Sequence, residues 1–288
     1  WANTIFAIIT AGGLVLIIFL GMTYETTEPI DYFEMPHGTT GIILAFVLIF
    51  FAFIGFEDMA NVAEEVKRPK KTIPRAIILS VIITGILYIL VSLSVVRVIN
   101  WEELGQSAAP LAAIAERSLG IQGSIALSAI ALFATASTVL ITLVAGSRIL
   151  YGMAHNKSLP LSLGKIHSKT KTPWIAVIGI LITSIAFTLI GDIVIVANIT
   201  VFAVVITFAM INLSVIVLRY TEPNLERSFR VPVNIGRFPL LPLFGFGVTI
   251  YMAIQFEMEV MLVGFAIMAA GALFYVIFNR KQNDAKLN

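Results

Sequence analysis

The stretch of sequence that decides the fold covers residues 51–74 and reads FAFIGFEDMANVAEEVKRPKKTIP. It begins as apolar as a membrane-spanning segment, but Gly55 interrupts it, and Glu57 and Asp58 follow. Glycine lacks a side chain and weakens a regular helix. A carboxylate is costly in hydrocarbon, so inside a membrane protein it faces other protein or a wet cavity. The pattern therefore predicts a membrane-spanning helix that is broken near Gly55.

The end of this segment has a second interpretation. The span could simply end at Phe56, which would leave Glu57 and Asp58 at the membrane surface. The apolar stretch Met59–Ala63 after the two acids favours a helix that continues into the cytoplasmic half of the membrane. Unwound stretches of this kind occur at mid-membrane, where free backbone groups and helix ends meet a solute.

The composition of the chain indicates a lipid bilayer as its surroundings. Apolar residues make up 58% of the 288 residues and charged residues only 12%, whereas an average soluble domain has about 25% charged residues. The absence of cysteine excludes disulfides and thiolate metal sites. Three scattered histidines have no metal-ligand spacing, so we expect no metal and no cofactor. The formal net charge of +2 gives no indication of a nucleic-acid partner.

Eight uncharged runs are long enough to cross a membrane, which takes about 20 mainly apolar residues. Backbone hydrogen bonding in lipid favours helices, and the runs lack the alternation of membrane strands. We therefore predict an all-α membrane protein with eight transmembrane helices. The runs are 1–24, 35–56, 76–96, 121–147, 172–191, 193–218, 238–256 and 260–279.

Lysine and arginine are distributed unevenly between the connections of these runs. Seventeen of the nineteen lie in alternate connections and in the C-terminal tail, that is, in 64–75, 148–171, 219–237 and 280–288. Basic connections stay on the cytoplasmic side of a membrane. We therefore predict a multi-pass protein of the cytoplasmic membrane with a cytoplasmic C-terminus. The opposite connection 98–120 is long and half apolar, and either forms a short helix from about Ala109 or a structured surface loop.

Several motifs resemble the amino acid–polyamine–organocation family of permeases. The resemblance begins with FAFIGFED and AEEVKRPKKTIPRAI in the stretch quoted above. It extends in the same order over most of the chain, with NTIFAIITAGGLVLII (3–18), SRILYGMAHNKSLP (147–160), KTKTP (169–173) and FRVP (229–232). The first motif is fairly specific, and the ordered set adds to it.

The resemblance implies a partial LeuT-type inverted-repeat fold. The chain would be a single transmembrane transporter domain over 1–288 that lacks its N-terminal part and corresponds to the family's helices five to twelve. Residues 1–24 would be the last helix of the first repeat, 35–218 the second repeat, and 238–279 two additional helices. The family's first helix, which holds the carboxylate and amine of the substrate, would be absent, and with it half of the binding site.

By the same resemblance, the break near Gly55 is the other half of the substrate site. The substrate would lie against Phe51, Ala52, Phe53, Ile54 and Gly55. Phe51 would be an aromatic gate, and the backbone carbonyls of Phe53, Ile54 and Gly55 would face the ammonium group of the substrate. Ordinary packing is the alternative for Phe51.

Glu57 would lie just inside the same site. Two roles stay open for its carboxylate. It could titrate and couple to the inner gate, or it could serve as a fixed hydrogen-bonding partner. Asp58 is the weaker candidate, because neighbours on a helix point about 100° apart.

The coupling ion is also open, with H⁺ and Na⁺ as candidates and ion-free exchange as a third possibility. Thr10 falls where some proton-coupled relatives carry a lysine, which counts against that proton mechanism. Its hydroxyl and those of Ser137 and Thr138 could instead ligate Na⁺. The favoured alternative is that these hydroxyls bond to carbonyls of their own helices or permit close helix packing.

The resemblance implies secondary active transport of an amino acid or related amine by alternating access. The alternatives are a solute sensor or channel on the same fold, or an inactive fragment that lacks half of the site. An enzyme is not expected, because the sequence has no nucleophile elbow, phosphate-binding glycine loop or zinc signature. The oligomeric state is not indicated.

Overall fold

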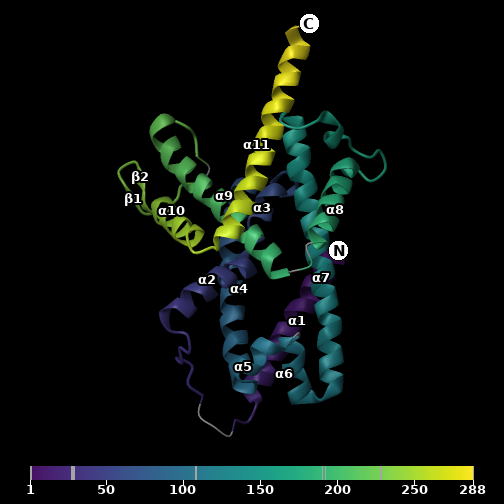
Figure 1. Ribbon diagram of the computed structural model, residues 1–288, viewed down its shortest axis with the longest axis vertical. Coiled ribbons are helices and arrows are strands. Elements are labelled where there is room, and N and C mark those ends of the chain that lie inside the picture. The colour runs from purple at the N-terminus through teal and green to yellow at the C-terminus, as the bar shows by residue number, and fades with distance from the viewer. Residues whose placement is uncertain are drawn as a thin grey trace. The chain divides into compact units, whose positions relative to one another are not determined.

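The computed structural model describes residues 2–26, 30–107, 109–189, 191, 193–227 and 229–287, and almost all of its regular structure is helical (Figure 1). The helices are α1 (Ala2–Thr23), α2 (Gly38–Phe53), α3 (Asp58–Asn61), α4 (Pro69–Val98), α5 (Trp101–Gln106), α6 (Pro110–Leu119), α7 (Ile121–His155), α8 (Trp174–Thr188), α9 (Ile193–Thr221), α10 (Leu240–Ala253) and α11 (Met258–Leu287). Two 3₁₀ helices cover Ala63–Glu65 and Leu161–Gly164, and the strands β1 (Asn234–Ile235) and β2 (Phe238–Pro239) form an antiparallel hairpin.

Six segments of the described chain are long and apolar enough to cross a membrane. They are Asn3–Thr23, Gly38–Asn61, Pro69–Val98, Ile121–His155, Ile193–Thr221 and Met258–Ile277. This confirms a helical membrane protein with several apolar spans, while the number eight stays a prediction. Two of the predicted runs form helices of only 15 and 14 residues, α8 and α10. At 1.5 Å per residue each covers about 22 Å, less than the ~30 Å of hydrocarbon.

Local sequence explains why α8 and α10 are short. Gly191, with φ of 80°, lies at the end of the predicted run that contains α8, and the helix already ends at Thr188. The run that contains α10 begins with Phe238 and Pro239, and the hairpin takes both residues as strand β2. The last three residues of that run lie outside α10, which ends at Ala253.

The chain divides into two compact units, of which the first contains residues 1–36 and 77–145. Ile17 and Ile114 are fully buried in its core, together with Val98 and Ile99. Helices α1 and α4 come close together at Gly21, where a Cβ atom would lie only 2.5 Å from the Ser94 carbonyl oxygen. Small residues at such crossings let two helix backbones come close together.

The predicted helix in connection 98–120 is present as α6, and its amphipathic sequence packs into the same core. Arg117, near its end, donates a 2.9 Å hydrogen bond to the Val98 carbonyl and forms a 2.6 Å ion pair with Glu103 of α5. Of the two interpretations offered for this connection, the short helix is therefore confirmed.

The second unit contains residues 37–76 and 146–288. Its core is built around Phe202 of α9, which is 1% exposed and meets Phe256 and Phe265 edge to face at 5.5 and 5.3 Å between ring centroids. After α9, the guanidinium of Arg227 donates to the carbonyls of Leu218 and Glu222 at 2.9 and 2.8 Å. Both carbonyls also accept backbone amides, from Glu222 at 3.2 Å and from Leu225 at 3.3 Å, so the guanidinium adds a second donor to each of them.

Candidate functional site

The backbone leaves the helical path at the predicted break. Helix α2 ends at Phe53, and Ile54 is extended, with φ of −60° and ψ of 136°. Gly55 follows with φ of +119°, a conformation that side-chain-bearing residues rarely adopt. The helix resumes at Asp58 as α3. The sequence-based prediction of a helix broken near Gly55 is confirmed in the backbone.

The chain after the break differs from the helix expected over Met59–Ala63. Helix α3 has only four residues and is followed by a three-residue 3₁₀ helix. Val62 separates the two helices. Its φ of −109° and ψ of 13° are outside the helical region. The continuing helix is thus one turn long.

Glu57 turns its side chain back onto the break. The Gly55 N–H donates a 2.8 Å hydrogen bond to Glu57 Oε2. A broken helix leaves amides without carbonyl partners, and a carboxylate is a strong acceptor for them. This geometry suits the fixed hydrogen-bonding role left open for Glu57. Next to it, Asp58 Oδ1 accepts a 3.2 Å hydrogen bond from Asn61 within α3.

The five residues predicted to meet the substrate differ in their surroundings. Phe51 is 45% exposed and Ala52 and Gly55 are also exposed, while Phe53 and Ile54 are partly buried. Ile54 packs against the core of the second unit. The Gly55 carbonyl accepts the Asp58 N–H at 3.2 Å. Within the described part of the chain the Ile54 carbonyl accepts no hydrogen bond, so it can accept one from a ligand.

The three hydroxyls predicted for an ion site all make hydrogen bonds. Thr10 donates to the Phe6 carbonyl at 2.9 Å and Thr138 to the Ala134 carbonyl at 3.1 Å, each one turn back in its own helix. This is the back-bonding that the sequence analysis favoured. Ser137 instead pairs with Asn3 Oδ1 at 2.6 Å and links α7 to α1. A donating hydroxyl keeps lone pairs for a cation, so the ion site stays a prediction.

Sequence reasoning missed an ion pair close to the break. Glu65, the last residue of the first 3₁₀ helix, pairs with Arg148 near the end of α7. The side chains are 57% and 35% exposed, respectively. The pair connects the segment that follows the break to the C-terminal part of α7, which belongs to the same unit. A run of acids before KRPKK gives no signal of this partner, which is more than 80 residues away in the chain.

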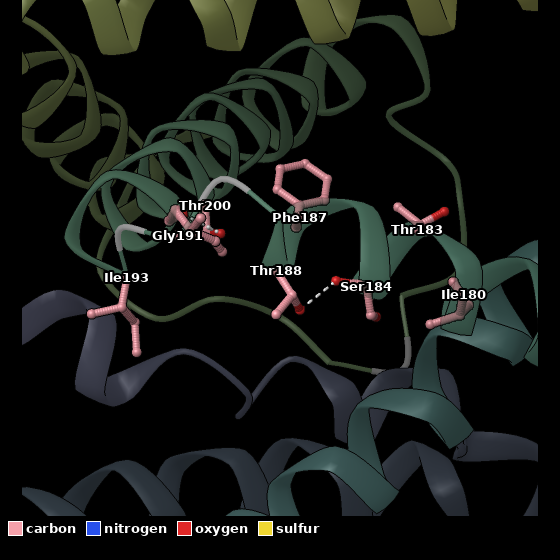
Figure 2. A pocket seen from close by; sticks show the side chains of 9 residues that line it. Ile180, Thr183, Ser184, Phe187, Thr188, Gly191, Ile193 and Thr200 are labelled. Atoms are coloured by element: carbon pink, nitrogen blue, oxygen red, sulfur yellow. Dashed lines mark hydrogen bonds between the residues drawn. The ribbon is translucent and has the colours of Figure 1, made fainter.

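A second missed feature is a cleft of about 500 Å³ between α8 and α9 (Figure 2). Four hydroxyl residues line it together with Phe187 and other apolar side chains. The figure shows Thr188 bonded to Ser184 of the same helix, at 2.9 Å. Thr183 and Thr200 likewise donate to their own helices. Three of the four hydroxyl protons are therefore already engaged, and the predicted site residues lie elsewhere.

Comparison with known proteins relates the sequence to a family of permeases. The family model described as "Amino acid permease" matches residues 1–282. The chain is 29% identical to a methylthioribose transporter of Bacillus subtilis (strain 168), over 98% of this chain and 60% of the relative. It is also 29% identical to a branched-chain amino acid permease of the same organism, over 96% of this chain and 58% of the relative.

A human relative extends the comparison beyond bacteria. The large neutral amino acids transporter small subunit 2 of Homo sapiens is 28% identical, over 96% of this chain and 53% of the relative. The chain thus spans between about half and three fifths of the length of these relatives.

Proposed function

The chain belongs to the amino acid permease family, and on this premise we propose that it serves secondary active transport of an amino acid or related amine across the cytoplasmic membrane. Members of such a family are carriers, so the chain is not an enzyme. The observation that carries the proposal is the break at Gly55 inside a 24-residue apolar segment, beside the Ile54 carbonyl, which accepts no hydrogen bond from any residue that the structure describes.

The proposed substrate site is the stretch 51–55. The free carbonyl of Ile54 would accept a hydrogen bond from the substrate ammonium group, and Phe53 and Gly55 would line the same turn. The ring of Phe51 would cover a cation or an apolar side chain. Ala52 would supply a small wall. Glu57 would hold the turn open through its bond to the Gly55 amide.

The architecture proposed around this site is the partial LeuT-type fold, with eight spans and a cytoplasmic C-terminus. Residues 1–24, 35–218 and 238–279 would form the last helix of one repeat, the second repeat and two additional helices. In such folds the site lies between repeats. Transport would then need the upstream helices that supply the other half of the site, and the coupling ion would be H⁺ or Na⁺.

The relatives narrow the proposed substrate class. Two of the three described above are named for branched-chain or large neutral amino acids, and the third for methylthioribose. A partly apolar wall of Phe51, Phe53 and Ile54 suits an apolar side chain. We therefore place neutral amino acids first and amines second.

The test is uptake by the complete permease, with upstream helices restored, in proteoliposomes. Labelled amino acids, polyamines and methylthioribose are offered with and without a proton or sodium gradient. Saturable uptake of one class is the expected result, and its gradient dependence identifies the ion or exchange. Binding without flux in folded protein would favour a sensor, and currents far above carrier turnover a channel. The chain alone is expected to be inactive.

Replacement of Glu57 separates its two roles. Glu57→Gln keeps an oxygen that accepts the Gly55 amide but loses the charge, whereas Glu57→Ala loses both. We expect Glu57→Ala to reduce uptake by about tenfold, the effect of losing a charge-assisted hydrogen bond of ~1.5 kcal/mol. If the carboxylate titrates, Glu57→Gln also flattens the pH profile of uptake. An unaltered pH profile would show that Glu57 is not a coupling group.

Truncation of Phe51 tests the aromatic gate. Phe51→Ala should raise the apparent substrate constant at least several-fold, because an aromatic contact of ~1 kcal/mol is lost. Phe46, also on α2 and 47% exposed, provides the matched control, since the same truncation there removes an exposed ring outside the proposed site. Equal apparent constants for the wild type and Phe51→Ala would remove Phe51 from the gate.

A further inference from the structure

The first turn of α4 carries a positive cluster that the transport proposal does not use. A cavity of about 380 Å³ is lined by Arg68, Pro69, Lys70 and Lys71. All four residues are exposed. The ion pairs found among the described residues are Arg117–Glu103 and Arg148–Glu65, so no described carboxylate neutralises the three cations.

The backbone adds to this positive field. Helix α4 begins at Pro69 and is 30 residues long, and the start of a helix carries partial positive charge. The amides of Lys71 and Thr72 both bond to the Arg68 carbonyl at 3.1 Å. In the described part of the chain the amide of Lys70 has no acceptor. The start of a helix and three cationic side chains thus lie at the same cavity, which is the chemistry that holds a phosphate group.

The position along α4 identifies the source of that phosphate. The helix is one of the candidate spans, and its exposed apolar side chains begin at Ile78 and Leu79, 51% and 56% exposed. From Lys71 to Ile78 is about 10 Å along a helix. The headgroup layer on each side of the hydrocarbon is ~5–8 Å thick. The backbone of Lys71 thus lies just outside that layer. Long lysine and arginine side chains extend along the protein surface, so charges at the start of α4 come within reach of the lipid phosphates when the apolar part is in hydrocarbon.

We propose that Arg68, Lys70, Lys71 and the start of α4 form a binding site for the phosphate of an anionic phospholipid. This proposal requires that α4 crosses the membrane, and it does not depend on which solute is transported. Other arginines with described partners are engaged differently, since Arg148 pairs with Glu65 and Arg227 binds backbone carbonyls. A headgroup held here would anchor the start of α4, directly after the segment that follows the break.

The test measures retention of phosphatidylglycerol against phosphatidylcholine by the whole chain. Purified protein in detergent is mixed with equal amounts of both lipids, and bound lipids are counted by native mass spectrometry. The site variant carries Arg68→Gln, Lys70→Gln and Lys71→Gln. The matched control carries Lys165→Gln, Lys169→Gln and Lys171→Gln, which removes the same charge from another exposed basic segment.

The wild type and the control should retain phosphatidylglycerol preferentially. The site variant should bind it at least about fivefold more weakly, the effect of one membrane-adjacent cation. The charge-preserving combination of Arg68→Lys, Lys70→Arg and Lys71→Arg should stay close to the wild type. If the triple variant does not fold, the same measurement is made on the single variants Lys70→Gln and Lys71→Gln.

Two results would overturn the proposal. Equal loss in the site variant and the control would mean that basic loops attract the lipid without a specific site. Competition by inorganic phosphate at millimolar concentration, with saturable binding in the absence of lipid, would identify a soluble anion as the ligand instead.

Discussion

Replacing Gly55 by valine should abolish uptake by the complete permease, to below about a tenth of the wild-type rate. The physical reason is the φ of +119°, which a β-branched residue adopts only with strain of ~1–3 kcal/mol. The chain can relieve this strain only by moving Ile54 and Gly55, and with them the carbonyl that the substrate would meet. Uptake of the transported amino acid and thermal unfolding measure the two consequences.

A matched substitution separates backbone strain from added bulk. Nothing lies within 4 Å of a Cβ atom built at Gly55 or at Gly247 of α10, but only Gly55 has a positive φ. Gly247→Val should therefore keep most of the uptake, because valine is more favourable than glycine in a helix interior by a few tenths of a kcal/mol. Full activity of Gly55→Val would mean that the break does not need this backbone and would remove it from the site.

Reversing the charge of Arg148 should reduce uptake by about tenfold, and exchanging it with Glu65 should restore most of it. Arg148→Glu places two carboxylates together and releases the segment after the break from α7. A pair this exposed contributes only ~0.2–1 kcal/mol to stability. The fold should therefore survive while the position of the segment changes, and uptake should fall more than the melting temperature does.

The pair Arg117–Glu103 is a control of nearly equal exposure, 40% and 57%, in the other unit. Glu103→Lys breaks this pair and keeps the bond from Arg117 to the Val98 carbonyl, and it should leave uptake within about twofold of the wild type, because exposed pairs contribute little. The combination of Glu65→Arg with Arg148→Glu decides the interpretation. If it transports no better than Arg148→Glu alone, the ion pair itself is not what holds the segment.

Much of the helical framework follows from local chemistry. Long apolar runs can satisfy their backbone in lipid only as helices, and the described residues contain six candidate spans. The break near Gly55 was predictable because a glycine followed by two acids cannot continue an apolar helix cheaply. Helix α6 was predictable in outline from the half-apolar connection 98–120. The structure ends this helix before Gly120, which has a φ of 71°.

The tertiary structure decided which polar groups meet. Glu65 finds Arg148, and Ser137 finds Asn3, across 134 residues in the second case. No periodicity in a sequence encodes such pairs, because they depend on how whole helices pack. The direction of Glu57 is decided locally instead, because the break leaves the Gly55 amide, two residues away, without a helical partner.

By itself, the sequence determined the membrane setting, the helical class, the family resemblance and the place of the break, because these depend on composition, run length and single residues. Only the tertiary structure decided that Glu65 pairs with Arg148 and that Ser137 bonds to Asn3. The physical reason is that burial in lipid acts on each segment separately, whereas hydrogen bonds and ion pairs act over a few ångströms between segments that packing alone brings together.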